Sequence, residues 1–325
     1  MDHQIMGELA GTAAEGMLLA AGGGAGRKPA VKRKGGREAM EVFFHLLFLL
    51  CGTVAVAFVL FISVYLVVSG VPAIREIGLA DFLFGQVWAP TATTVEPAFG
   101  ILPFILTSVY GTAGAVLLGV PIGLMTAIFL AKVAPPKAAR VIKTAVELLA
   151  GIPSVVYGLV GMIVLVPAIR DLFGLSSGAC LLAAIVVLAI MILPSIINVS
   201  ETALRAVPRE YEEASLALGA TEIETYFRVS LPAASSGVAT AVVLGVGRAI
   251  GEAMAIIMVS GNVANMPGLF TSVRFLTTAI ASEMSYASVG SLQRSALYSI
   301  GLVLFLFIML INVLLNVFIK NKKED

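Results

Sequence analysis

The sequence is poor in cysteine, histidine, tryptophan and charge. Its 325 residues include two cysteines, two histidines and one tryptophan, and only 13% are charged whereas 59% are hydrophobic. Cys51 and Cys180 lie in apolar segments, where a thiol acts as a small hydrophobe, so we expect neither a disulfide nor a metal site. The shortage of charge excludes an ordinary soluble domain and indicates a protein whose solvent is lipid. With a net charge of +1, nucleic-acid binding is not indicated.

Residues 1–40 show no sustained helical or strand period. They are rich in glycine and alanine, and then in lysine and arginine. A secretory signal would place its basic residues before a long apolar core, whereas the apolar run at 17–21 is short and the basic cluster at 27–37 follows it. We predict a disordered, basic cytoplasmic tail over 1–40 and a second, short cytoplasmic tail over 321–325.

Six apolar segments are long enough to cross a membrane. A helix that rises 1.5 Å per residue needs about 20 residues to cross about 30 Å of hydrocarbon. The segments lie at residues 43–68, 102–131, 145–169, 179–200, 231–261 and 295–319. They predict an all-α, polytopic membrane protein whose six transmembrane helices form one domain over 41–320. Prolines inside these spans, such as Pro121 and Pro194, favour kinked or broken helices around an interior cavity.

Lysine and arginine are distributed unevenly among the segments that connect the spans. Alternate segments, counted from the N-terminal tail, hold 16 of the 21 basic residues, the others hold 4, and Arg248 alone lies inside a span. Short cytoplasmic loops retain positive charge, so the basic segments are expected to face the cytoplasm. We therefore predict a multi-pass protein of the inner membrane with both termini in the cytoplasm.

Two spans carry a small residue at every fourth position. The rows are Gly111, Ala115, Gly119, Gly123, Ala127 and Ala131, and Ala233, Gly237, Ala241, Gly245, Ala249 and Ala253. Such rows let helix backbones approach closely. Because six small residues stand in register twice, we interpret both rows as packing faces and not as a by-product of composition.

The charged segment 201–230 is a loop between the fourth and fifth spans. Gly219 suits a left-handed helix end, and Thr221 and Glu224 have the spacing of a capping box. These signals predict two short helices joined by a turn. A solvated linker is the alternative, but the apolar residues at 216–218 suit a partner's groove better than water.

A spaced motif runs through this loop and into the next span. Its residues are Glu213, Ala214, Ser215, Gly219, Val229, Leu231 and Pro232. The pattern resembles the EAA loop of binding-protein-dependent ABC importer permeases, with Ser215 and Val229 in place of the family's alanine and isoleucine. The resemblance implies that the loop is the coupling helix, which inserts into a cleft of an ATPase subunit, and that the fold is that of a type I importer permease.

The chain has no ATP site of its own. A phosphate-binding P-loop needs a glycine, four residues and then Gly-Lys-Ser/Thr, whereas Lys28 is followed by Pro29. We therefore expect no bound cofactor, and ATP and magnesium on a separate ATPase subunit. We expect a transporter subunit and not an enzyme.

Two opposite charges stand in the predicted fifth span. Arg248 and Glu252 are four residues apart, so on a continuous helix they share one face and can pair. A charge at this depth costs about 2.5–3.5 kcal/mol on insertion scales and needs a partner or water. A structural ion pair is one interpretation. The other is a substrate path, in which Arg248 attracts an anion and Glu252 keeps the site from holding it permanently.

Three motifs around these charges resemble the phosphate-importer permeases of the PstC type. They are residues 247–255, GRAIGEAMA, followed by Gly261 and Asn262; residues 147–158, ELLAGIPSVVYG; and residues 99–103, FGILP. The resemblance implies transport of inorganic phosphate into the cytoplasm, by a complex with a homologous second permease subunit, two ATPase subunits and an extracytoplasmic phosphate-binding protein. Sulfate and molybdate permeases share the Arg-Ala-x-Gly-Glu element and remain an alternative.

Glu147 is a further possible site residue, four positions after Lys143 at the expected start of the third span. An ion pair of these two residues at the membrane interface is the competing interpretation. A membrane sensor or scaffold that docks a partner through 201–230 without transport is a second class of function. An intramembrane enzyme is a third, but the sequence contains no Gly-x-Ser-x-Gly elbow and no His-Glu-x-x-His zinc motif.

Overall fold

The computed structural model describes residues 35–92 and 96–321. Residues 1–34 and 322–325, which hold most of the two predicted tails, lie outside this range. Helix α2 (Gly35–Ile77) begins within the segment that the sequence assigns to the tail, so the last residues before 41 are helical. The chain divides into two compact units, one ending at Phe61 and one beginning at Ile62.

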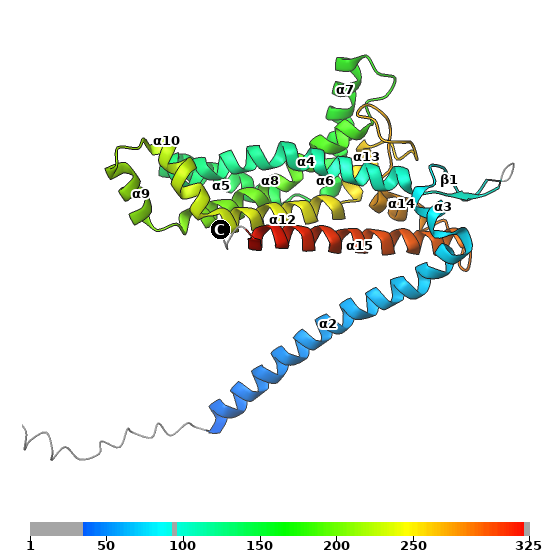
Figure 1. The fold of residues 1–325 in the computed structure, drawn as a ribbon, viewed down its shortest axis with the longest axis horizontal. Helices are drawn as coiled ribbons and strands as arrows, with labels where there is room; N and C mark the ends of the chain where they lie inside the picture. The colour runs from blue at the N-terminus through cyan, green and yellow to red at the C-terminus, as the bar shows by residue number, and fades with distance from the viewer. Residues whose placement is uncertain (1–34, 93–95, 322–325) are drawn as a thin grey trace, which may run out of the picture. The chain divides into compact units, whose positions relative to one another are not determined.

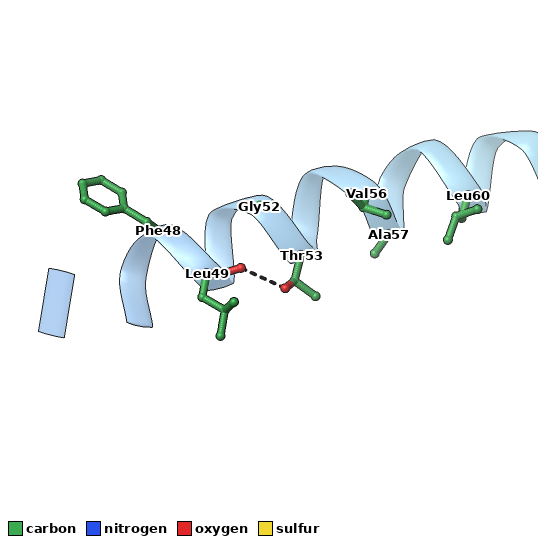
Figure 2. Close-up of a pocket in the computed structure, with 7 residues that line it drawn as sticks. All are labelled: Phe48, Leu49, Gly52, Thr53, Val56, Ala57 and Leu60. Atoms are coloured by element: carbon green, nitrogen blue, oxygen red, sulfur yellow. Dashed lines mark hydrogen bonds between the residues drawn. The ribbon is translucent and has the colours of Figure 1, made fainter. Parts of the chain in front are cut away.

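The first unit contains the N-terminal part of α2. Most of its described side chains are apolar, with Glu41, His45 and Thr53 as exceptions, and all of them are exposed, as expected for a helix that spans lipid (Figure 2). Thr53 satisfies its hydroxyl inside the helix, because Oγ1 donates to the Leu49 carbonyl oxygen at 2.8 Å. A hydrogen bond of this kind, from a hydroxyl to the backbone carbonyl one turn earlier, lets a polar side chain lie in hydrocarbon without an unpaired donor.

The second unit contains the remaining elements (Figure 1). In chain order these are α3 (Leu79–Phe84), β1 (Trp88–Ala89), β2 (Ala98–Phe99), α4 (Leu102–Ile128), η1 (Phe129–Val133), α5 (Pro136–Gly151), α6 (Ser154–Val160), η2 (Gly161–Leu165), α7 (Val166–Phe173), α8 (Leu181–Arg205), α9 (Arg209–Ala217), α10 (Glu222–Thr225), η3 (Tyr226–Ser230), α11 (Leu231–Ala233), α12 (Ser235–Gly251), α13 (Met254–Val259), α14 (Leu276–Glu283) and α15 (Leu292–Asn321). The three η elements are single π-helical turns that continue a helix. Strands β1 and β2 form a short antiparallel pair.

Five helices are long and apolar enough to cross a membrane, and one bent pair of helices makes a sixth span when it is counted as one. The five are Met40–Ile77, Leu102–Val133, Ser154–Phe173, Leu181–Arg205 and Leu292–Leu315. The pair, fifth in chain order, joins Glu222–Ala233 to Ser235–Gly251 through a bend of 73°. The all-α membrane fold is therefore confirmed, with six spans when this bent pair is counted as one.

The predicted bounds of two spans were wrong. The third span begins at Ser154 and not at 145, because Ile152 and Pro153 are extended and separate it from α5. Helix α5 is an amphipathic helix of its own. The fifth span ends at Gly251, because Glu252 and Ala253 leave helical geometry before α13.

Small residues bring the central helices together. A side chain at Gly119 or Gly123 of α4 would collide with Ile192 or Ile196 of α8, because its Cβ would lie 2.8 Å from them. Gly245 of α12 faces the same Ile196 at 3.2 Å. Both small-residue rows therefore contribute to helix packing, and α8 forms the centre against which α4 and α12 lie (Figure 1).

The end of the second unit that carries α3, β1, β2 and α14 holds a separate hydrophobic cluster. Phe82, Trp88 and Phe104 pack there against Leu276 and Leu297. The part of α2 that belongs to this unit joins the cluster alongside α15, where the Ser299 hydroxyl donates to the Gly70 carbonyl oxygen at 2.6 Å. The cluster fixes the segments that connect the spans at this end.

Candidate coupling loop and substrate path

The segment 201–230 contains the two predicted short helices, α9 and α10. Helix α8 continues to Arg205, so the first five residues of the segment belong to the preceding span. Helix α9 follows Pro208, which occupies its N-cap position, and α10 continues through η3 toward the next span. The two-helix interpretation is confirmed, with a loop that starts later than expected.

Local sequence signals determine the turn between α9 and α10. Gly219 has φ +88°, and a Cβ there would meet no atom within 4 Å, so its backbone conformation and not crowding requires glycine. Thr221 and Glu224 form the predicted capping box. The Glu224 N–H donates to Thr221 Oγ1 at 3.3 Å, and the Thr221 N–H donates to Glu224 Oε2 at 3.1 Å. The direction of α10 therefore follows from these residues.

The motif residues of the loop fall into an exposed group and a group at its base. Glu213 and Ala214 are exposed on α9, which buries no residue of its own. Leu231 packs at the base of the loop in a cluster around Ala127 and Leu204, and Pro232 follows it in α11. The loop is thus anchored at its base and presents α9 outward.

Apolar side chains cover the outward surface of the loop. Tyr211, Leu216, Leu218, Ile223 and Phe227 are exposed, and Leu218 at the turn is 90% exposed. Exposed apolar side chains grouped on a short charged segment mark an interaction surface. The surface is consistent with insertion into a groove on a partner.

Glu212 joins α9 to two spans, and the sequence analysis missed it. Its carboxylate forms an ion pair with Lys132 of η1, and the Ser230 hydroxyl of η3 donates to Glu212 Oε1 at 2.7 Å. Burial opposes ionisation, but the bonds from Lys132 and Ser230 outweigh it and lower the pKa of Glu212 below its ordinary value. The carboxylate is therefore charged at neutral pH. No local spacing could reveal contacts between residues so far apart in the chain.

A second charged group, centred on Glu201, was also missed. Its side chain is 2% exposed, and it accepts hydrogen bonds from Arg205 Nε at 2.8 Å and Lys143 Nζ at 3.2 Å. Arg205 also donates to the Leu130 carbonyl oxygen at 2.8 Å. The four-residue spacing of Glu201 and Arg205 could have indicated their ion pair from the sequence, but not the bond from Lys143. Lys143 therefore pairs with Glu201, while Glu147 is exposed on α5, and the structure does not show the ion pair of Lys143 and Glu147 that was the competing interpretation.

Arg248 and Glu252 do not form the ion pair that was one of the two interpretations of their spacing. Arg248 lies in the last turn of α12, but the helix ends at Gly251 and Glu252 has extended backbone, so the two side chains do not share a helical face. Glu252 Oε1 instead accepts the Ala255 N–H at 3.1 Å at the start of α13, and the Thr277 hydroxyl donates to its carbonyl oxygen at 2.7 Å. Within the described part of the chain, no ion pair links the two residues.

Arg248 lies four residues before Glu252, where the chain leaves α12. It is partly buried and within electrostatic range of Tyr157 on α6, whose hydroxyl donates to the Leu149 carbonyl oxygen of α5 at 2.7 Å. Gly158 of α6 approaches α13 closely, because a Cβ there would lie 2.8 Å from Ala255 Cα. The breaks before α6 and before α13 are therefore neighbours. Arg248, which has no salt-bridge partner among the described residues, lies close to the break before α13.

A third polar group lies at the opposite end of the second unit from the coupling loop. Arg274 forms an ion pair with Glu283 and donates to the Asn262 carbonyl oxygen at 2.8 Å, and Trp88 Nε1 donates to Glu283 at 3.0 Å. The group borders a cavity of about 430 Å³ and ties β1 to α14. Among the residues that the structure describes, no cluster of histidine, cysteine, aspartate and glutamate could hold a metal ion.

Sequence comparison places the chain among membrane permeases. Residues 119–323 match the family described as binding-protein-dependent transport system inner membrane component. The chain is 40% identical to the probable ABC transporter permease protein YqgH of Bacillus subtilis, over 86% of this chain and 92% of that protein. It is 34% identical to the phosphate transport system permease protein PstC of Pasteurella multocida over 85% of this chain and 92% of that protein, and 36% identical to PstC of Xylella fastidiosa over 84% and 89%.

Solved structures support the same fold. The methionine ABC transporter MetNI, in an inward-facing conformation, matches 68% of this chain and 95% of its own with a TM-score of 0.54 at 22% identity. A bacterial alginate ABC transporter in complex with a periplasmic protein matches 87% of this chain and 94% of its own with a TM-score of 0.56 at 16% identity. The family match over residues 119–323 and the identity to the PstC proteins show that the chain belongs to the family of binding-protein-dependent transport system inner membrane components, as an ABC importer permease of the PstC type and not an enzyme.

Proposed function

We propose that the chain conducts inorganic phosphate through the inner membrane toward the cytoplasm. The observation that carries this proposal is Arg248, a half-buried cation in a membrane span whose expected partner, Glu252, binds α13 instead. An uncompensated cation at this depth is costly and marks an ion pathway. Phosphate is an anion that a guanidinium binds through paired hydrogen bonds. The PstC relatives supply the choice of phosphate among anions.

Arg248 and Glu252 have different tasks in this path. Arg248 supplies the positive charge that draws the anion into the bundle. Glu252 fixes the start of α13 through the Ala255 N–H and keeps the break in the span open beside Arg248. Its negative charge near the path also limits how tightly the anion is held. Glu147, exposed on the amphipathic helix α5, is a weaker candidate for the cytoplasmic end of the path.

The coupling loop is proposed to receive its motion from an ATPase subunit. Its exposed apolar side chains, with Glu213 and Ala214 on α9 and Gly219 at the turn, fit a cleft on such a partner. The complete complex would contain a homologous second permease, two ATPase subunits and an extracytoplasmic phosphate-binding protein. ATP and magnesium would bind to the ATPase subunits. The loop and both termini would then lie in the cytoplasm.

Uptake by the reconstituted complex tests the proposal. Proteoliposomes that contain the chain, its second permease and the ATPase subunits are supplied with ATP inside and binding protein with labelled phosphate, sulfate or molybdate outside. ATP-dependent uptake of phosphate, in excess over the other two anions, is the expected result. Preferred uptake of sulfate or molybdate would contradict the assignment of phosphate, and absence of any uptake would favour a sensor or scaffold.

A further inference from the structure

Few polar side-chain bonds hold helix α9 against the membrane spans. The helix buries none of its residues. Its described side-chain bonds are those of Glu212 with Lys132 and Ser230, and the contact of Ser215 with the Thr225 hydroxyl at 2.9 Å. The Ser215 contact stays inside the loop, because Thr225 ends α10. Among the described residues of α9, only Glu212 therefore makes a side-chain hydrogen bond or ion pair with an element that leads into a span.

A cavity separates α9 from the end of α4. Its volume is about 370 Å³, and its lining includes Lys132, Glu212, Leu216 and Tyr226. Close packing would otherwise transmit a displacement of α9 directly to the spans. With the cavity in between, the ion pair of Glu212 and Lys132 crosses this gap.

The two partners of Glu212 belong to different spans. Lys132 lies in η1, which continues α4, and Ser230 ends η3, which leads through α11 to α12 and Arg248. The pair is well shielded from water, since the side chains of Lys132 and Glu212 are 10% and 17% exposed. An ion pair shielded in this way is screened less by salt than a surface pair and holds its geometry better.

We propose that Glu212 is a positioning residue that transmits movement of the coupling loop to α4 and α12. Its carboxylate holds α9 to Lys132 and Ser230, so a displacement of α9 moves the ends of both spans together. This inference rests on the proposed function, in which α9 receives the force of ATP hydrolysis. It adds Glu212 to the coupling element, and this residue is not part of the motif that resembles the EAA loop.

The test measures transport per ATP hydrolysed in the reconstituted complete complex. We expect Glu212→Gln and Lys132→Met to bind the ATPase with unchanged affinity and to hydrolyse ATP, while the ratio of anion transported to ATP hydrolysed falls about 10-fold. The exchange variant Lys132→Glu/Glu212→Lys restores opposite charges and should recover most of the ratio. Glu210→Gln is the matched control, since it removes an exposed carboxylate from the same helix and should leave the ratio unchanged.

Each other outcome overturns the inference. An unchanged ratio in Glu212→Gln shows that the contact does not transmit movement, and loss of ATPase binding shows that Glu212 is a docking residue. If the single variants fail to reach the membrane, the exchange variant decides, because a folded exchange variant with a low ratio contradicts transmission through this pair. The ratio is measured with whichever oxyanion the unmodified complex imports, so a wrong choice of phosphate affects the proposed function and not this test.

Discussion

At the scale of single residues, the break after Gly251 changes what the two intramembrane charges do. The four-residue spacing of Arg248 and Glu252 places them on one face only if the helix is continuous. Because Glu252 is extended and caps α13, its negative charge is directed to a backbone N–H and not to the guanidinium. The two residues should therefore respond differently to substitution, and this separates the path from a structural ion pair.

Arg248→Gln should leave the complex folded and nearly inactive. No ion pair of the described chain is broken by this change, and the cost of a charge in the membrane is removed. We expect initial uptake to fall about 10- to 100-fold, as for the loss of a contact with a charged group worth about 1.5–3 kcal/mol. Labelled-anion uptake and size-exclusion chromatography of the complex provide the measurement. Arg170→Gln, at an exposed site paired with Asp171, is the control, and normal uptake by Arg248→Gln would remove Arg248 from the path.

Glu252→Ala and Glu252→Gln should differ in stability. Glutamine keeps an oxygen that can accept the Ala255 N–H, whereas alanine leaves this donor unpaired and should destabilise the protein by about 1 kcal/mol, as for other N-terminal caps. Thermal unfolding of the purified complex in lipid nanodiscs measures the difference. A structural ion pair with Arg248 predicts a different pattern, in which glutamine is as harmful as alanine because both substitutions remove the charge.

At the scale of elements, the direction of the coupling loop depends on the turn at Gly219. Gly219→Val forces a β-branched residue into left-handed geometry and should cost about 1–3 kcal/mol of local stability. We expect weaker binding of the ATPase, measured by co-purification, and lower phosphate uptake. Gly219→Asn is the control, because asparagine tolerates this conformation better than other residues. A Gly219→Val complex that assembles and transports normally would show that the loop does not act as the coupling element.

The sequence predicted elements where the signal was local. Long apolar runs gave six spans, and the capping box and Gly219 gave the two helices of the loop, because each signal lies within a few residues of the feature that it determines. Pro153 indicated a break at this position, but the sequence analysis assigned the whole apolar run at 145–169 to one helix. The break at Glu252 carries no proline, and tertiary contacts such as the bond from Thr277 favour it.

The site was predicted only in part for the same reason. The motif residues Glu213, Gly219 and Leu231 are close in sequence and were found by their spacing. The partners of Glu201 and Glu212 lie on other helices, so Lys143 and Lys132 could be assigned only from the packed structure. The Arg274 and Glu283 pair depends on a segment between two helices whose course the sequence pattern does not determine.

At the scale of the whole molecule, the two ends of the second unit differ in charge. The end with the coupling loop carries Lys132, Lys143, Arg205 and Arg209, and each of the first three has an acidic or backbone partner that holds it in place. The end with β1 and α14 carries fewer basic residues, and the Arg274–Glu283 pair neutralises one of them. Positive charge in short connecting segments is retained on the cytoplasmic side. The coupling loop should therefore face the cytoplasm, where ATP is available.

Cysteine labelling tests this orientation in the complete protein. In a background with Cys51→Ala and Cys180→Ala, Met266→Cys lies between α13 and α14, where the native methionine is 43% exposed, and should react with a membrane-impermeant maleimide on intact cells. Thr221→Cys in the coupling loop and Ala138→Cys in α5 should react only after permeabilisation, because the positive-inside distribution places both in the cytoplasm. The cysteine-free background controls for unspecific labelling. Labelling of Thr221→Cys from outside would place the coupling loop on the wrong side for an ATPase and would contradict import driven by ATP.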